Sequence, residues 1–257
     1  MQSKPTATSA ERELEELTRS AEEARQKVLT TVDRREVERY LDPPADTPYG
    51  LEYAYYLLGD VACKNVLDLG CGKGENLVPL AERKANVTGI DVSPDLVSLA
   101  ERRIEMAGVK ATVRVGSAYH TGLPDESVDA ILCIALVHHL EIPRVRDEMW
   151  RVLKKGGFVV LSEPIRLSRT YGAIRKLLPA NRNSSEHEHP LNQEELRCLC
   201  EGFTRENVRH FRLPFVPLVE RLRRSASHSA RLLSARVIDA CPLSQHFATV
   251  VVMRLRK

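Results

Sequence analysis

Residues 65–74 read NVLDLGCGKG, and residues 86–91 read NVTGID. The first stretch is a β-rich apolar segment that runs into three glycines spaced two residues apart, and a helix-like stretch follows it. The second stretch is another strand, and it ends in an acid, Asp91. This order of strand, glycine turn, helix, strand and acid is typical of a nucleoside-cofactor site. Glycines let the backbone approach the ligand closely and adopt positive φ, and the acid can accept hydrogen bonds from both ribose hydroxyls.

The residues around the glycines indicate which nucleoside is bound. A dinucleotide site needs the pattern GxGxxG, but the residue three positions after Gly72 is Glu75. Asp68 would also face the turn that receives a pyrophosphate, whereas an acid at that point suits a cationic group. S-adenosylmethionine carries an ammonium and a sulfonium, together with one carboxylate that can lie at a helix N-terminus. The pattern therefore favours S-adenosylmethionine over NAD.

At this point the sequence resembles the class I S-adenosylmethionine-dependent methyltransferases. It is similar to the small-molecule branch, in which the first motif reads LDLGCGxG and an hHL segment follows the fourth strand. The resemblance covers roughly residues 65–164. It implies a Rossmann-like fold, S-adenosylmethionine as the cofactor and S-adenosylhomocysteine as the product.

Strand and helix patterns alternate along this region and predict an α/β fold with a doubly wound, mostly parallel sheet. We expect strands at 65–69, 86–91, 111–116, 128–134 and 157–162, and helices near 75–83, 94–107, 143–153 and 193–201. The resemblance adds a late pair of strands near 204–212 and 247–255, of which the last runs antiparallel. The expected sheet thus has seven strands.

Three parts are expected along the chain: a disordered tail (1–8), an N-terminal helical lid segment (9–60) and the Rossmann-like methyltransferase domain (61–257). Apolar residues recur at helical spacing after Ser9, which we expect to cap the first helix. Insertions near 165–190 and 214–242 are too long for ordinary connections, so we expect each to form part of a substrate cap.

The resemblance assigns the cofactor-binding residues position by position. It implies that the methionine end is held by Asp68 and the glycine turn, the ribose by Asp91, and the adenine by residues after the second and third strands. The expected set is Asp68, Gly70, Cys71, Gly72, Gly74, Asp91, Val92, Ser117, Ala118 and Ile134. Ser117 departs from the family, because relatives commonly carry an acid there that accepts from the adenine amino group. A serine hydroxyl can still accept one hydrogen bond.

Two histidines and three tyrosines are further site candidates. His138 and His139 follow the fourth strand, where one of them could act as a general base because neutral imidazole is available near neutral pH. The alternative is that they pack or hydrogen-bond locally. Tyr49, Tyr53 and Tyr56 could share one helical face and form a lid over cofactor and substrate, or else fill the core.

Motifs of other methyltransferase classes are missing from the expected places. No Asn/Asp-Pro-Pro-aromatic motif follows the fourth strand, as it does in nucleic-acid amino methyltransferases. No acid cluster suits a magnesium-dependent transfer, and the stretch EHEH at 186–189 lacks a spacing that would converge metal ligands. We therefore expect metal-free transfer to a small molecule at oxygen or nitrogen, with sulfur or carbon less favoured.

The composition of the chain limits its cellular compartment and its kinds of partner. The chain has 257 residues, 43% of them hydrophobic, which suffices for one sizeable core. Its net charge of +3 is too mild to indicate nucleic acid. Six cysteines show no disulfide framework, and neither a signal peptide nor a spanning apolar run is visible. We expect a cytoplasmic protein without a membrane span, whose amphipathic N-terminal helix could pair in a homodimer.

The charge distribution keeps a second interpretation open. From Arg205 onward, eleven lysines and arginines stand against three acids. This is either a solvated basic face or a surface for an anionic substrate, an acidic partner or a membrane. The alternative functions are therefore methylation of a macromolecular or lipid-like anionic acceptor, or a catalytically inactive S-adenosylmethionine-binding partner protein.

Overall fold

The computed structural model describes residues 8–26, 32–168 and 189–257, which include a seven-stranded sheet. The strands lie in the order β3-β2-β1-β4-β5-β7-β6. They are β1 (Asn65–Leu69), β2 (Asn86–Asp91), β3 (Thr112–Val115), β4 (Val128–Ile134), β5 (Leu153–Pro164), β6 (Thr204–Phe211) and β7 (Val250–Arg256). Six strands run in one direction, and β7 is antiparallel to both of its neighbours. The Rossmann-like doubly wound sheet is confirmed.

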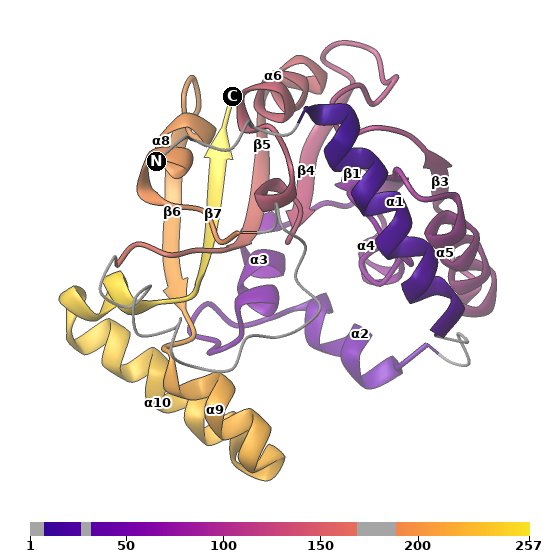
Figure 1. Ribbon diagram of the computed structural model, residues 1–257. Helices are drawn as coiled ribbons and strands as arrows, with labels where there is room; N and C mark the ends of the chain where they lie inside the picture. Colours follow the sequence, from indigo (N-terminus) through magenta and orange to yellow (C-terminus); the bar gives the residue numbers. More distant parts are fainter. Residues whose placement is uncertain (1–7, 27–31, 169–188) are drawn as a thin grey trace.

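Helices cover both faces of this sheet (Figure 1). They are α1 (Ser9–Gln26), α2 (Arg34–Leu41), α3 (Gly50–Leu58), α4 (Leu77–Glu82), α5 (Pro94–Ala107), α6 (Ile142–Val152), α8 (Gln193–Leu199), α9 (Phe215–Leu222) and α10 (Ser227–Ala240). Short 3-10 turns add η1 (Val137–His139), η2 (Arg224–Ala226) and η3 (Pro242–Phe247). Side chains of α3, α4 and α5 pack on one face, and those of α6 and α8 pack on the other.

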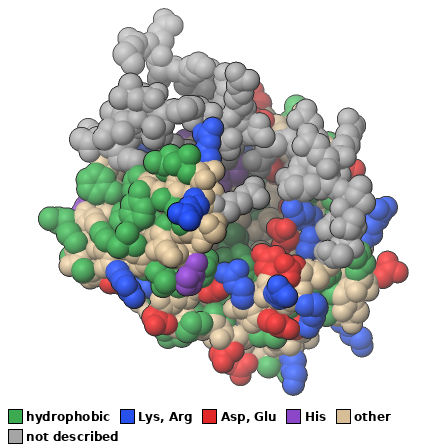
Figure 2. Space-filling view, turned by 90° about the horizontal axis from the view of Figure 1, so that it is seen from below, with side chains coloured by type: hydrophobic (Ala, Val, Ile, Leu, Met, Phe, Trp, Pro, Cys, Tyr) green, Lys and Arg blue, Asp and Glu red, His purple; other side chains and the backbone are tan. Residues whose placement is uncertain are grey.

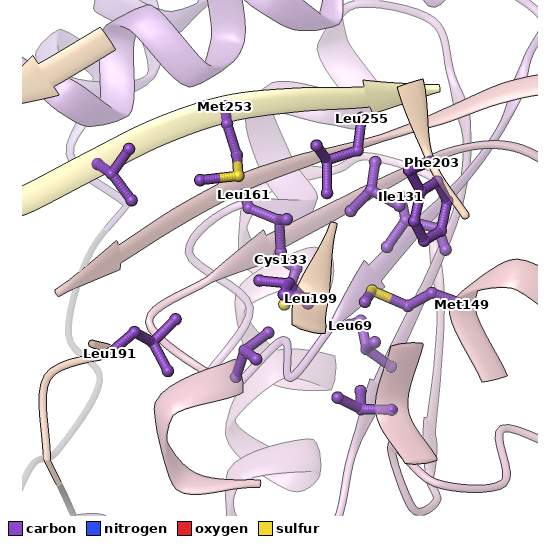
Figure 3. Packing of buried hydrophobic residues seen from close by; sticks show 14 of the residues in the cluster. Leu69, Ile131, Cys133, Met149, Leu161, Leu191, Leu199, Phe203, Met253 and Leu255 are labelled. Atoms are coloured by element: carbon purple, nitrogen blue, oxygen red, sulfur yellow. The ribbon is translucent and has the colours of Figure 1, made fainter. Parts of the chain in front are cut away.

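The central strands are apolar on both sides. Along β4, Ile131 and Cys133 join the core cluster beneath α6 and α8, whereas Ala130 and Leu132 join the cluster beneath α3 and α4. Figure 3 shows the first cluster, in which Met149 of α6 lies with side chains of the sheet. Parallel strands that are buried on both faces read as continuous apolar runs, which explains why the sequence predicts these strands well.

The edges of the elements differ from the sequence-based expectations. β5 begins at Leu153 rather than 157, because the polar stretch Lys154–Gly156 continues the strand. β7 begins at Val250, since Phe247 belongs to η3 and is exposed. Thr8 rather than Ser9 caps α1: the Thr8 Oγ1 accepts from the Glu11 backbone N–H at 3.3 Å. The insertion at 214–242 holds α9 and α10, whereas residues 169–188 of the other insertion, like 1–7, lie outside the described residues.

Candidate functional site

Two neighbouring strands of the sheet define a crevice. β1 connects through α4 to β2 on one side, and β4 connects through α6 to β5 on the other, so the strand order reverses between β1 and β4. In open α/β sheets, ligands bind at the carboxyl ends of the strands at such a reversal. Here β1 ends in the glycine turn and β4 ends in the segment that carries both histidines.

The glycine turn needs glycine for backbone conformation and for space. Gly70, Gly72 and Gly74 have φ values of 73°, 52° and 78°, a region that side chains disfavour. A Cβ on Gly74 would lie 2.9 Å from the Ala100 Cβ, which belongs to α5. The Gly70 N–H donates to the Ile90 carbonyl at 2.8 Å, which ties the turn to β2. Close packing against α5 and the hydrogen bond to β2 therefore fix the conformation of the turn.

Asp91 connects the end of β2 to the glycine turn. Its Oδ2 accepts from the Gly72 N–H at 2.8 Å, and its Oδ1 accepts from the Ser93 N–H at 3.0 Å. An ionised carboxylate offers about four acceptor positions. These two backbone bonds therefore orient Asp91 and remain compatible with ribose hydroxyls as further donors.

Asp68 is a carboxylate buried inside the site. It is 1% exposed, and neither of its oxygens meets a hydrogen-bond donor at bonding geometry among the described residues. Burial and the charge of Asp91 raise the pKa of Asp68 to about 7, with the Asn76 side chain opposing the shift in part. An unsatisfied buried carboxylate is unfavourable, and a nearby cation would relieve it. This chemistry fits an ammonium or sulfonium group.

A small cavity adjoins Asp91 at the ends of β2 and β3. Its volume is about 50 Å³, and its lining includes four of the expected cofactor residues, Gly70, Asp91, Val92 and Ala118. The other lining residues come from the strand ends, the segment after β4 and α1: Arg12, Glu13, Glu16, Ile90, Gly116, Leu136, His139 and Leu140. A cavity of this size holds only a few water molecules.

Helix α1 contributes Arg12, Glu13 and Glu16 to the lining of this cavity, and three side-chain hydrogen bonds anchor it. The Arg12 guanidinium donates to the His139 carbonyl at 3.3 Å. The Ser117 hydroxyl donates to the Glu13 carboxylate, and the Arg144 guanidinium donates to the Ser9 hydroxyl. Ser117, which lacks the family's acid, thus meets a carboxylate supplied by α1. Sequence reasoning missed Glu13 because it lies 104 residues away in a charged helix without a distinguishing motif.

A large cavity of about 660 Å³ lies on the other side of the segment that follows β4. Arg12 and Leu140 line both cavities. The remaining lining residues are Thr8, Ser9, Val137, His138, Glu141, Ile142, Pro143, His189, Leu191, Glu194, Glu195 and Cys198. Six of the fourteen lining residues are apolar, and three glutamates against one arginine make the charge of the lining acidic.

His138 lines the large cavity and is held by a buried carboxylate. Its Nδ1 lies 2.8 Å from Oε2 of Glu163, a residue near the end of β5 that is 1% exposed. The other oxygen, Oε1, accepts from the Leu136 and Val137 N–H groups, each at 2.9 Å. An ionised Glu163 carboxylate can only accept, and such a pair places the proton of a neutral imidazole on Nδ1.

Glu163 was not predicted from the sequence, although a signal exists. It is the one acid within the apolar run Phe158–Pro164, and a charge in a strand buried on both faces needs a partner. His139, in contrast, lines the small cavity, with its ring centroid 3.9 Å from that of His138. The two rings are thus neighbours in different surroundings. His138 is hydrogen-bonded to Glu163, and His139 lies beside the nucleoside crevice.

The turn after β4 has an unusual backbone. Ala135 has a φ of 52°, and its N–H donates to the Ser162 carbonyl at 2.8 Å. A residue with a Cβ seldom adopts this conformation, and strain of this kind gathers at functional sites. The turn directs the following segment across the crevice and brings His138 to Glu163.

The comparison with protein families identifies the domain that contains this crevice. Residues 67–161 match the model of a family described as a methyltransferase domain. They form a class I S-adenosylmethionine-dependent methyltransferase domain. The cofactor of this superfamily is S-adenosylmethionine, and Asp68, Asp91 and the glycine turn fit its charges and its ribose.

Individual relatives agree with the assignment of the methyltransferase domain. A ubiquinone biosynthesis O-methyltransferase of Psychrobacter arcticus is 29% identical over 63% of this chain and 66% of its own length. The chain spans between 54% and 66% of the length of the first three curated relatives that it matches.

Solved structures share the fold over nearly the whole chain. A geranyl diphosphate C-methyltransferase of Streptomyces coelicolor has a TM-score of 0.63 at 17% identity and covers 97% of this chain and 99% of its own. A protein named a [4+2]-cyclase has a TM-score of 0.60 at 17% identity and covers 98% of this chain and 97% of its own. At this identity the likeness concerns the fold alone, and the second name shows that the fold also carries another reaction.

Five further expected site residues line neither of these two cavities: Tyr49, Tyr53, Tyr56, Cys71 and Ile134. The Tyr53 ring packs on Phe211 and on Tyr56, with centroids 5.5 and 5.7 Å apart, and the Tyr49 hydroxyl bonds His228 at 2.7 Å. Burial raises the pKa of the Cys71 thiol, which packs against Gly89. Ile134 lines a separate cavity of about 100 Å³ beneath α2, together with Tyr40 and Asn76.

The described ranges 8–26, 32–168 and 189–257 contain neither a candidate metal site nor a candidate membrane-crossing helix. No group of three or more His, Cys, Asp or Glu side chains in them could hold a metal ion. Among the helices of these same residues, none is both long and apolar enough to cross a bilayer.

Proposed function

We propose that this chain transfers a methyl group from S-adenosylmethionine to an oxygen or nitrogen atom of a small molecule. One observation carries the proposal: His138 lines the large cavity with its Nδ1 bound to Glu163, next to the cofactor crevice. A base at the border between a cofactor site and a roomy cavity is the arrangement that transfer to a protonated acceptor needs.

Each group has a definite role in this proposal. When bound, the cofactor supplies an activated methyl group on a sulfonium. Asp68 and the glycine turn hold its methionine end, Asp91 holds the ribose, and residues 92, 117 and 118 surround the adenine. Holding the acceptor in line with methyl and sulfur is worth roughly 7–11 kcal/mol of barrier in favourable cases.

His138 removes the acceptor proton as the new bond to the methyl carbon forms. The proton passes to Nε2, and the carboxylate of Glu163 stabilises the imidazolium through Nδ1. Glu163 acts through His138 and is therefore a positioning residue. Its two bonds from backbone N–H groups fix its direction, so the imidazole does not need to reorganise during transfer.

The cavity indicates the acceptor class. Glu141, Glu194 and Glu195 line the large cavity opposite Arg12, which favours a neutral or cationic acceptor over an anionic one. Several relatives are named ubiquinone biosynthesis O-methyltransferases, and this supports an oxygen acceptor on a largely apolar molecule. All six cysteines are free thiols, which supports a reducing compartment such as the cytoplasm.

The cofactor is tested first, by calorimetric titration with S-adenosylhomocysteine and, separately, with NAD. We expect micromolar binding of S-adenosylhomocysteine alone, and its loss in Asp91→Ala. Asp95→Ala is the matched control, since this acid lies exposed in the first turn of α5. Binding of NAD, or of neither ligand, would overturn the proposal.

The base is tested by methyl transfer to a panel of catechols, phenols and amines, with S-adenosylhomocysteine release as the readout. In Glu163→Gln and His138→Asn we expect kcat to fall about 10²–10⁴-fold, with S-adenosylhomocysteine affinity unchanged. Unchanged kcat in both folded variants would show that the pair is structural.

The two alternative functions predict other results. An inactive partner protein binds S-adenosylhomocysteine but turns over no acceptor in the panel. Methylation of an anionic macromolecule would show as transfer that falls steeply with salt. The acidic lining of the large cavity argues against the second of these.

A further inference from the structure

The helices after β6 expose a set of large apolar side chains. Leu222 and Leu243 are 76% and 75% exposed, far more than a core-forming leucine. We define the hairpin surface as the exposed apolar residues of α9, α10 and η3, namely Leu218, Leu222, Leu233, Val237, Leu243 and Phe247. Surfaces of this kind on a folded domain mark sites of interaction.

The hairpin surface is distinct from the face that anchors these helices. Leu218 and Leu222 are four residues apart on α9, as are Leu233 and Val237 on α10, so each pair shares one side of its helix. Other side chains of the helices are buried: Val216, Ala230, Ser234 and Ile238. The Ser234 hydroxyl accepts from the Leu213 N–H at 2.9 Å. The helices are thus fixed to the domain while their leucines face outward.

Positive charge accompanies these apolar residues. Between positions 212 and 247 the sequence holds six arginines and two acids. Both acids are paired within the domain: Glu220 with Arg212 at 3.1 Å and with Arg231, and Asp239 with Arg209 at 3.5 Å. Arg221, Arg223 and Arg236 are exposed on the same two helices and at their ends. The local surface is therefore apolar and cationic together.

The hairpin surface lies on the side of the molecule that holds the cofactor crevice. β6 runs in the same direction as β5, and α9 follows the carboxyl end of β6. The arrowheads of β4 and β5 point to the side where α9 and α10 lie (Figure 1). Seen from that side, Figure 2 shows hydrophobic side chains gathered on the left, with Lys or Arg side chains among them.

We propose that the hairpin surface docks this protein onto an anionic lipid bilayer. Leucines beside arginines are the composition of interfacial helices, in which apolar side chains enter the acyl boundary and cations meet anionic headgroups. Contact with an apolar face of a protein partner would not account for the excess of arginine. Docking is peripheral and brings the carboxyl edge of the sheet toward the membrane. It does not depend on the identity of the methyl acceptor.

The test is cosedimentation of the full chain with vesicles of phosphatidylcholine, with and without phosphatidylglycerol. We expect binding to the anionic vesicles only, weakening as salt rises. The double variant Leu222→Ser/Leu243→Ser should bind at least about tenfold more weakly, since two leucines no longer leave water. Arg221→Gln/Arg236→Gln should bind more weakly and with less dependence on salt.

The matched control is Met106→Ser, because Met106 is an apolar residue on α5 that is 50% exposed. It should bind vesicles as the wild type does, and all variants should keep the wild-type affinity for S-adenosylhomocysteine. Absent vesicle binding, or equal binding by the leucine variant, would overturn the proposal. So would a wild-type dimer in light scattering that the leucine variant loses, since a second copy would then cover the surface.

Discussion

Asp68, for which we propose a binding role, also carries a cost to the folded protein. Its carboxyl has a pKa of about 7 in the fold against an ordinary value of 3.8, because burial disfavours the charged form. A pKa raised by folding means that the folded state holds the proton more tightly than the unfolded chain. The corresponding stability is fully present below about pH 4 and is lost as pH rises through about 7.

The variant Asp68→Asn tests this cost. We expect it to be more stable than the wild type at pH 8, by an amount on the order of a few kcal/mol, and nearly equal to it at pH 4. Urea unfolding at both pH values measures the difference. The control Asp95→Asn should follow the wild type, and an identical pH dependence in Asp68→Asn would contradict the assignment. The same variant should bind S-adenosylhomocysteine more weakly.

At the scale of single residues, motif and chemistry predict part of the site. Asp91 and the glycines lie where the pattern placed them, because a turn at a strand end has few solutions. Glu163 and Glu13 were missed, since each meets its partner only after distant segments are brought together. Local spacing carries no information about such pairs.

At the scale of elements, α1 closes the nucleoside crevice. Its anchors at Arg12 and Glu13 hold it against a cavity of about 50 Å³ at the ends of β2 and β3. When the binding-competent state is only a fraction of the population, the observed affinity falls by that fraction. We therefore expect the helix to control how readily the cofactor enters.

Loosening α1 should accelerate binding. In Glu13→Ala we expect the association rate of S-adenosylhomocysteine to rise several-fold, because the contact with Ser117 is removed. Stopped-flow fluorescence measures the rate. Thr18→Ala is the control, since the Thr18 hydroxyl donates to the Leu14 carbonyl of its own helix in an exposed position. A slower association in Glu13→Ala would show instead that Glu13 helps to receive the cofactor.

Sequence patterns predict the elements unequally. Apolar runs bounded by glycine predict the central strands, whose two buried faces leave little choice of residue. The helices of the 214–242 insertion were not predicted, because their apolar residues serve an outer face as well as the core. The periodicity of their apolar residues is therefore mixed, and only the length of the segment indicated an insertion.

At the scale of the whole molecule, the core is independent of α1. Neither core cluster of the described residues includes a side chain from this helix. We expect a chain lacking residues 1–31 to keep the sheet, with a melting temperature by circular dichroism within a few degrees of the full chain. A change this small corresponds to roughly 1 kcal/mol or less.

Introducing a charge into the buried strand β7 should have the opposite effect to removing α1. Val252 is fully buried where β7 pairs with both β5 and β6, so Val252→Asp should abolish cooperative melting. If the shortened chain also failed to fold, α1 would be part of the core rather than a cover.

The position of β7 between β5 and β6 has a consequence for synthesis of the chain. A ribosome releases β6, α9 and α10 before β7, so β6 leaves the exit tunnel before the strand with which it pairs. Until translation reaches β7, β5 and β6 both present unpaired strand edges, which are templates for aggregation. The outward-facing leucines of α9 and α10 are exposed during the same interval. Nascent chains halted before Val250 should therefore bind chaperones, and chains extended beyond β7 should release them.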